Sequence, residues 1–168
     1  GREWMTLLVG GLGGGGKGFF ALNVTDPASQ FTSEANAANS VLWEFTDKDD
    51  TYPVDASNNP IGGGALVDPD GRPVKDLGLA LQQPSLVMSN VDDGSGEKEW
   101  VAVFGNGLNS TAGIAKLFVL FMNRGVDGWG PGDFIKLDTG VGVPVAPAPL
   151  AGYPNGLGTT TSVDVDLN

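Results

Sequence analysis

WVAVFG at residues 100–105, AKLFVLF at residues 115–121 and DFIKLD at residues 133–138 are three short apolar runs separated by glycine-bearing segments. Runs of this length, rich in β-branched and aromatic residues and bounded by turn formers, are typical of β-strands. A fourth run, Gln83 to Met88, precedes them. The sequence therefore predicts a unit of four consecutive strands in the second half of the chain.

The same order of runs occurs once before in the chain. Matching Val9-Gly10 to Phe104-Gly105 and Ala21-Leu22 to Val119-Leu120 gives offsets of 95 and 98 residues, so the repeat tolerates small insertions. A run from Thr161 to Val165 would open a third unit. The strands predicted for the first unit are Met5 to Gly11, Gly18 to Thr25 and Val41 to Phe45.

Successive four-stranded antiparallel units joined by glycine-bearing turns are typical of β-propeller blades, whose faces are buried by the neighbouring blades. A propeller closes with about four to eight blades, and this chain has strands for fewer than two complete blades and the start of another. We therefore expect an all-β fold, a partial β-propeller of about two four-stranded antiparallel blades of a larger ring. A self-contained β-sandwich built from the same seven or eight strands is the alternative.

Composition and charge limit the function classes. The 27 glycines and 11 prolines favour many strands and turns over long helices, and the 40% hydrophobic content is too high for a disordered acidic chain. A net charge of −11 repels phosphate backbones and anionic lipid headgroups, so nucleic acid and the membrane surface are not expected as partners.

The chain contains neither His nor Cys. Their absence removes the Ser-His-Asp and Cys-His arrangements, imidazole and thiolate metal ligands, and disulfides. No apolar run reaches the roughly 20 residues of a membrane-spanning helix. The first residues lack the charged-then-apolar pattern of a signal peptide, so we expect a mature or excised segment.

Oxygen-bearing side chains alternate along the last five residues. Asp164, Asp166 and Asn168 stand at positions one, three and five, as in the opening of many calcium-binding loops. The chain stops before the later ligands of such a loop, and a solvated acidic turn is the alternative interpretation. The equivalent segment of the preceding unit, Asn90 to Gly96, carries Asp-Gly and Ser-Gly pairs and is interpreted as a tight turn.

These patterns divide one partial propeller domain, residues 1–168, into five parts. Residues 1–47 supply strands of one blade, 48–77 a loop insertion rich in Pro and Gly, 78–140 the next blade, 141–158 an extended connection, and 159–168 the first strand and the start of a calcium loop of the following blade.

Three other features have ordinary structural interpretations. The segment Gly11 to Lys17 resembles a phosphate-binding loop but lacks the following Ser or Thr and the helix, so we interpret it as an inter-strand turn. Trp43 and Trp100 lie within apolar runs and are predicted to pack between blades. Carboxylates such as Glu97 and Glu99 are interpreted as solvated.

The amino-acid sequence of these predicted strands resembles that of a known protein family. VGGLG at residues 9–13, GGKGFFALNVTDP at 15–27, VLWEFTD at 41–47, QPSLV at 83–87 and WVAVFGNG at 100–107 are similar, in the same order, to the C-terminal β-propeller domain of the PilC/PilY family of type IV pilus tip and biogenesis proteins. The segments KLDTG at 136–140 and VDVD at 163–166 continue the resemblance, which excludes only the loops 48–77 and 143–158.

The resemblance implies an exported, non-enzymatic protein of the pilus tip or bacterial cell surface. In that family the acidic segment opens a calcium loop, which selects Asp164, Asp166 and Asn168 as its first ligands and calcium as the cofactor. Expected partners are the remaining blades of the same protein, pilins or minor pilins, and a host or abiotic surface contacted through other regions. A carbohydrate- or matrix-binding extracellular module and a fragment of a quinoprotein dehydrogenase propeller remain as alternatives.

Overall fold

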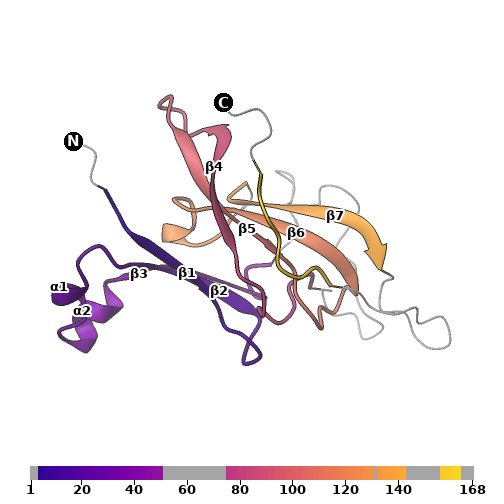
Figure 1. Cartoon of the computed structure of the whole chain (residues 1–168), viewed down its shortest axis with the longest axis horizontal. Coiled ribbons are helices and arrows are strands. Elements are labelled where there is room, and N and C mark those ends of the chain that lie inside the picture. The colour runs from indigo at the N-terminus through magenta and orange to yellow at the C-terminus, as the bar shows by residue number, and fades with distance from the viewer. Residues whose placement is uncertain (1–3, 51–74, 131, 143–155, 164–168) are drawn as a thin grey trace.

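A computed structural model of the chain describes residues 4–50, 75–130, 132–142 and 156–163, which form two antiparallel sheets (Figure 1). The first sheet contains three strands in sequence order: β1 (Leu7–Gly11), β2 (Gly18–Asn23) and β3 (Val41–Thr46). The β1–β2 connection is the glycine-rich turn, closed by a hydrogen bond from Leu12 N to Gly18 O of 2.9 Å. The interpretation of this segment as an inter-strand turn is confirmed.

The second sheet is a four-stranded meander, again in sequence order. Its strands are β4 (Ser85–Asp92), β5 (Lys98–Gly105), β6 (Ile114–Phe121) and β7 (Phe134–Gly142), with a 3₁₀ turn, η1 (Gly125–Asp127), between the last two. Each of these strands overlaps one of the predicted apolar runs, and β4 and β7 extend beyond the predicted ends at Met88 and Asp138. The sheet order is that of a propeller blade.

Two short helices between β2 and β3 were not predicted. They are α1 (Pro27–Gln30) and α2 (Glu34–Ala38), drawn at one end of the first sheet in Figure 1. Proline occupies the first turn of α1, where its missing N–H costs nothing, and the Ser33 side chain accepts a hydrogen bond from Asn36 N of 3.2 Å at the start of α2. Neither helix buries a residue fully.

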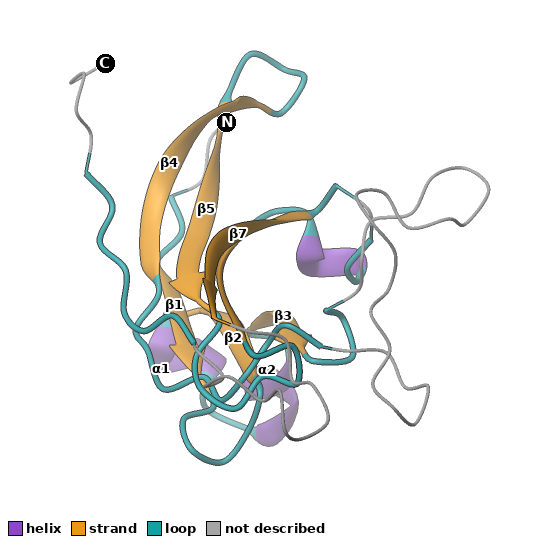
Figure 2. Ribbon diagram, turned by 90° about the vertical axis from the view of Figure 1, so that its right-hand side faces the viewer, coloured by secondary structure: helices purple, strands orange, loops and turns teal. Residues whose placement is uncertain are grey.

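The two sheets pack face to face through aromatic side chains. Phe19 of β2 stacks on Phe104 of β5 with ring centroids 3.9 Å apart, and Phe45 of β3 meets Phe118 of β6 and Phe134 of β7 edge to face. Trp43 is buried in the same cluster, so its predicted packing is confirmed. Figure 2 shows the strands of the second sheet rising beside those of the first.

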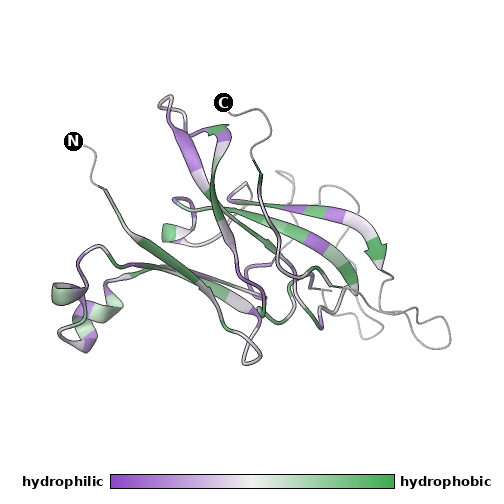
Figure 3. Ribbon diagram, viewed as in Figure 1, coloured by the Kyte–Doolittle hydropathy of each residue, from purple (hydrophilic) through white to green (hydrophobic). Residues whose placement is uncertain are grey.

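The opposite face of the second sheet is also apolar but is only partly covered. Alternation along β6 and β7 places Leu117, Val119, Ile135 and Leu137 on this face, and Leu137 is 50% exposed. The hydropathy colouring shows apolar residues along the strands of both sheets (Figure 3). A sheet that is apolar on both faces needs a neighbour on each side, and the fold is accordingly all-β, a partial propeller.

Beyond β7, the described segment 156–163 is extended and belongs to no strand, whereas a strand was predicted from Thr161. A strand is stable when a neighbouring strand accepts its hydrogen bonds. Among the described residues, no strand pairs with residues 161–163. No helix in the described ranges is long and apolar enough to cross a membrane.

Candidate functional site

The predicted calcium ligands Asp164, Asp166 and Asn168 lie outside the described residues, and so does most of the predicted loop 48–77. The segment that leads to the ligands is described and lies against the second sheet. Ser85 Oγ donates to Thr160 O at 3.0 Å, and Thr160 Oγ1 donates to Val103 O at 3.4 Å. Within the described ranges no three acidic, His or Cys side chains are grouped as metal ligands.

The β4–β5 connection has the geometry of a closed turn. Asp92 Oδ1 accepts hydrogen bonds from Gly94 N at 2.7 Å and Gly96 N at 3.0 Å. Asp93 Oδ1 accepts from Ser95 N at 2.8 Å and from Ser95 Oγ at 2.6 Å. The hydrogen bond from the Ser95 hydroxyl and that from its backbone N–H lower the pKa of Asp93 below its usual value. The interpretation of this segment as a tight turn is confirmed, because its carboxylates already bind the turn's own donors.

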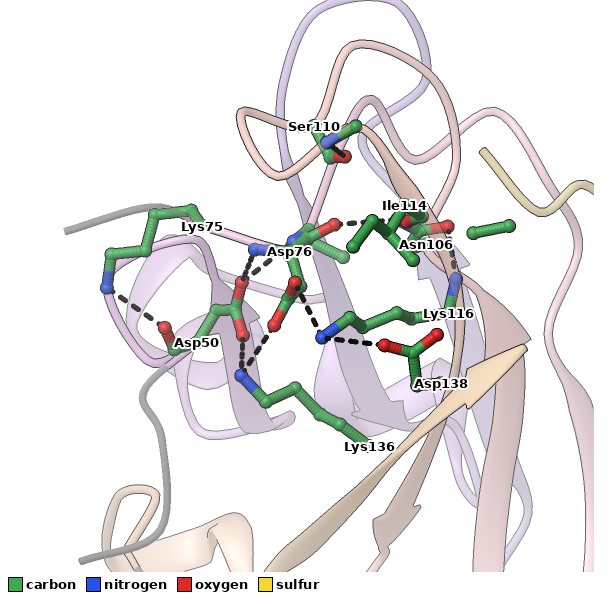
Figure 4. A network of polar contacts seen from close by, with 12 residues as sticks. Asp50, Lys75, Asp76, Asn106, Ser110, Ile114, Lys116, Lys136 and Asp138 are labelled. Carbon is green, nitrogen blue, oxygen red and sulfur yellow. Dashed lines mark hydrogen bonds and ion pairs between the residues drawn. The ribbon is translucent and has the colours of Figure 1, made fainter. Parts of the chain in front are cut away.

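The polar centre of the molecule is a buried ion network between the two sheets (Figure 4). Lys136 Nζ of β7 lies 2.9 Å from Asp50 Oδ1 and 2.9 Å from Asp76 Oδ2, and Lys116 Nζ of β6 lies 3.1 Å from Asp76 Oδ1. The side chains of both aspartates are completely buried. Two cations thus neutralise two carboxylates where water is excluded.

Backbone donors complete the shell of Asp50. Its Oδ2 accepts hydrogen bonds from Asp76 N at 2.6 Å and Leu77 N at 2.7 Å, and Lys75 Nζ donates to its backbone oxygen at 3.0 Å. Since Asp50 follows β3 and residues 75–77 precede β4, these bonds fix the path of the chain between the sheets. A buried carboxylate with this number of donors is held in one position.

Asn106, which follows β5, uses every hydrogen-bonding group of its side chain. Its Nδ2 donates to Asp76 O and to Ile114 O, each at 2.8 Å, and its Oδ1 accepts from Lys116 N at 3.0 Å and from Leu157 N at 2.9 Å. The last bond attaches the segment that leads to the predicted calcium ligands. Asn106 therefore connects the ion network to the segment around Leu157.

A second ion pair lies at the other end of the β5–β6 pair. Glu99 is only 4% exposed and accepts hydrogen bonds from Nε and Nη2 of Arg124, the former at 2.9 Å. Hydrogen bonding to Glu99 raises the pKa of Arg124 above its usual value. The interpretation of Glu99 as a solvated carboxylate is wrong, because the carboxylate is buried and its charge is balanced by Arg124. The Arg124 guanidinium also lies 4.0 Å from the centre of the Phe121 ring.

Sequence reasoning missed the ion network, although one signal was present. Lys116 and Lys136 interrupt apolar runs on the core-facing side of their strands. Phe118, which lies directly opposite Lys136 in the sheet, is a core residue. A lysine on the buried side of a strand requires an acidic partner. The arrangement has the character of a structural connection between the two sheets.

Comparisons with known proteins agree with this architecture. No family model matches the chain. It is 33% identical over 123 residues to a type IV pilus biogenesis factor PilY1 homolog of Xylella fastidiosa and 30% identical over 125 residues to PilY1 of Pseudomonas aeruginosa PAO1. These matches cover 73% and 74% of the chain, which spans only 6% and 7% of the two relatives.

Among solved structures, the C-terminal domain of Pseudomonas aeruginosa PilY1 matches 96% of the chain with a TM-score of 0.57 and 27% identity, and the chain spans 22% of that structure. The sequence and structure comparisons thus point to the same family. The chain therefore belongs to the PilC/PilY family of type IV pilus biogenesis factors, and corresponds to two adjacent blades from the C-terminal propeller domain.

Proposed function

We propose that this chain is a non-enzymatic part of a type IV pilus assembly factor, in which it forms two consecutive blades of a propeller at the pilus tip or cell surface. The observation that supports the proposal is the shared relationship to proteins named as type IV pilus biogenesis factors, over nearly three quarters of the chain. The buried contacts are of the kind that hold a rigid scaffold together. Pilins or minor pilins, and a surface contacted by other regions, would be its partners.

Genetic complementation tests this role. A strain of the source bacterium that lacks the gene is expected to lose surface pili and twitching motility, and the wild-type gene is expected to restore both. A gene carrying Phe104→Asp, which places a charge in the sheet–sheet core, should fail to restore them. The same change at Phe31, which is 49% exposed, serves as the matched control and should restore them. Normal piliation without the gene would contradict the proposal.

We further propose that calcium regulates the protein's control of pilus extension and retraction through the loop that begins at Asp164. Asp164, Asp166 and Asn168 supply the hard oxygen ligands that Ca²⁺ prefers. The cation would offset the repulsion between these carboxylates and order the loop. The hydrogen bond from Leu157 N to Asn106 Oδ1 links the ion network to the segment that precedes the proposed loop.

Calcium titration of the longer native protein tests this second proposal. Replacing Asp164 and Asp166 by Ala is expected to weaken calcium binding at least about tenfold. The same replacements at Asp92 and Asp93 form the control, since these carboxylates already serve their own turn, and should leave the affinity unchanged. Equal calcium affinity for the Asp164/Asp166 variant and the wild type would contradict calcium binding but not the pilus role.

A further inference from the structure

The ion network places a primary amine between two buried carboxyl groups. Lys136 Nζ lies 2.9 Å from Asp50 Oδ1 and 2.9 Å from Asp76 Oδ2 (Figure 4). The lysine side chain is 7% exposed, and both aspartate side chains are completely buried. An amine, a carboxyl group that it can attack and a second carboxyl group that can carry protons are the three components of an amide-forming site.

The two side-chain oxygens of Asp50 have different surroundings, and the difference suits attack by an amine. Oδ2 accepts hydrogen bonds from Asp76 N at 2.6 Å and from Leu77 N at 2.7 Å. Two backbone N–H groups directed at one oxygen stabilise the negative charge that it gains when a nucleophile adds to the carbon. Oδ1 instead faces the Lys136 amine, from which it can receive a proton. Asp50 therefore has one oxygen held as a future carbonyl and one oxygen placed to leave as water.

Asp76 is in a position to move the protons of such a reaction. Its Oδ2 accepts a hydrogen bond from Lys136 Nζ, and its Oδ1 lies 3.1 Å from Lys116 Nζ. A carboxylate within hydrogen-bond distance of an amine can take up a proton from it and pass that proton on. Lys116 remains as a cation beside Asp76 after the charge of Lys136 is lost, so the carboxylate is not left buried without a partner.

We propose that Lys136 and Asp50 condense in the folded protein to an intramolecular amide between Nζ and Cγ, an isopeptide bond. The Lys136 ammonium first passes one proton to Asp50 Oδ1, which leaves a neutral amine and a neutral acid. The amine lone pair then forms the Nζ–Cγ bond, and the negative charge on Oδ2 is held by the N–H groups of Asp76 and Leu77. The Asp76 carboxylate carries a second proton from Nζ to Oδ1, the Cγ–Oδ1 bond breaks, and water leaves. One ammonium and one carboxylate become one amide and one water, and no oxidant or co-reactant is consumed.

The buried site favours this condensation, although the same reaction is unfavourable between separate molecules in water. The fold holds the amine against the carboxyl group, which replaces a chance encounter by a high effective concentration. The ion network contains two lysines and two aspartates, and the reaction leaves Lys116 and Asp76 as a single buried ion pair. Because each buried charge costs free energy, removing two of them favours the amide. The reaction happens once in each molecule, so it is a self-modification and not an enzyme activity.

The bond gives the protein a covalent connection between its two sheets. Asp50 follows β3 and Lys136 lies in β7, so the amide joins the end of the first sheet to the last strand of the second. A pull along the chain then passes from residue 50 to residue 136 without loading β4, β5 or β6. This mechanical use rests on the pilus role proposed above, whereas the bond itself can be detected whatever the role of the protein.

Peptide mass mapping of the full-length native protein tests the proposal. Trypsin cleaves between Asp50 and Asp76, which therefore fall in different peptides, residues 49–75 and 76–98. We expect peptide 49–75 to be joined to the peptide that contains Lys136, with a combined mass lower by one water and with no cleavage after Lys136. Separate peptides with ordinary cleavage after Lys136, or a bond from Lys136 to peptide 76–98, would overturn the proposal.

Two substitutions separate the chemistry from the ion pairing. Lys136→Arg keeps a cation beside both aspartates but removes the amine, and should abolish the linked peptide. Asp76→Asn keeps the size of the side chain but removes the proton carrier, and should slow formation of the bond at least about a hundredfold in a pulse–chase experiment. Cleavage after Lys116 should be ordinary in every sample, which makes this lysine the internal control.

The wild-type peptide map decides whether the bond exists, even if a variant fails to fold. A folded Asp76→Asn variant that forms the bond at the wild-type rate would overturn the mechanism, because the assigned proton carrier would then be dispensable.

Discussion

Lys136 of β7 and Asp50, which follows β3, are 86 residues apart in sequence, and Lys136 Nζ lies 2.9 Å from Asp50 Oδ1 between the two sheets. The lysine side chain is 7% exposed and the aspartate side chain is completely buried. Their ion pair joins one blade to the next at a place where water cannot substitute for either partner. The two blades therefore depend on each other for electrostatic as well as apolar stabilisation.

Removing the lysine charge should destabilise the protein strongly. Lys136→Met leaves Asp50 and Asp76 without one of their cations, and loss of one partner of a buried ion pair costs about 3–5 kcal/mol. Urea unfolding followed by circular dichroism measures the change. Lys98→Met, at an exposed lysine that donates to Asn90 O, is the control and should change the stability by less than about 0.5 kcal/mol. Equal stabilities for the two variants would contradict a central role for the network.

The stack of Phe19 on Phe104 should account for much of the apolar interface. Phe19→Ala or Phe104→Ala is expected to cost about 3–5 kcal/mol in unfolding free energy, because each leaves a cavity between the sheets. In the double variant the losses should be less than additive by about 0.5–1.5 kcal/mol, the contribution of a direct aromatic pair. Phe31→Ala is the exposed control. Strict additivity would mean that the two rings do not interact.

Two glycines of similar backbone conformation should respond differently to a methyl group. Gly13 and Gly107 both have positive φ, at 64° and 71°, so alanine at either site costs about 1 kcal/mol of backbone strain. A Cβ at Gly13 would meet nothing within 4 Å, whereas one at Gly107 would overlap the backbone oxygen of Leu79. Thermal unfolding should therefore show a clearly larger loss for Gly107→Ala. Similar losses would indicate that the segment before β4 can move aside.

The pKa of Asp93 should depend on the Ser95 side chain. Hydrogen bonds from Ser95 hold it below its ordinary value of 3.8, so the stabilisation linked to Asp93 is present above pH 3.8 and is lost as the pH falls through the lowered pKa. Ser95→Ala should raise the pKa towards its ordinary value, as measured by NMR titration of the carboxyl carbon. Ser89→Ala in the neighbouring strand is the control. An unchanged Asp93 pKa in Ser95→Ala would contradict the turn geometry.

The sequence predicts the strands well because burial on both faces leaves a strong local pattern. Val101, Phe104 and Leu120 lie in runs whose length and β-branched or aromatic content are visible without the fold. The helices at Pro27 and Ser33 have local capping signals, yet they are one turn long and carry no apolar periodicity. Short helices of this kind are set by the path of the loop.

The ion network could not be predicted in the same way. The pairing of Lys136 with Asp50 depends on which blades are adjacent and on the path of residues 75–77, and charged residues near turns usually indicate solvent. Glu99 was misinterpreted for the same reason, since its partner Arg124 lies 25 residues further along the chain. The predicted ligands Asp164, Asp166 and Asn168 stay a prediction from sequence.

The placement of these two sheets within a larger ring is tested most directly by the accessibility of Leu137, on the far face of the second sheet. The chain has no cysteine, so Leu137→Cys gives a single reactive thiol. In the 168-residue chain it should react rapidly with a maleimide, as should the exposed control Asp127→Cys. In the longer native protein, with other cysteines replaced, labelling at position 137 should slow at least about tenfold because the next blade covers it, while position 127 is unaffected. Equally rapid labelling at position 137 in both proteins would contradict the account.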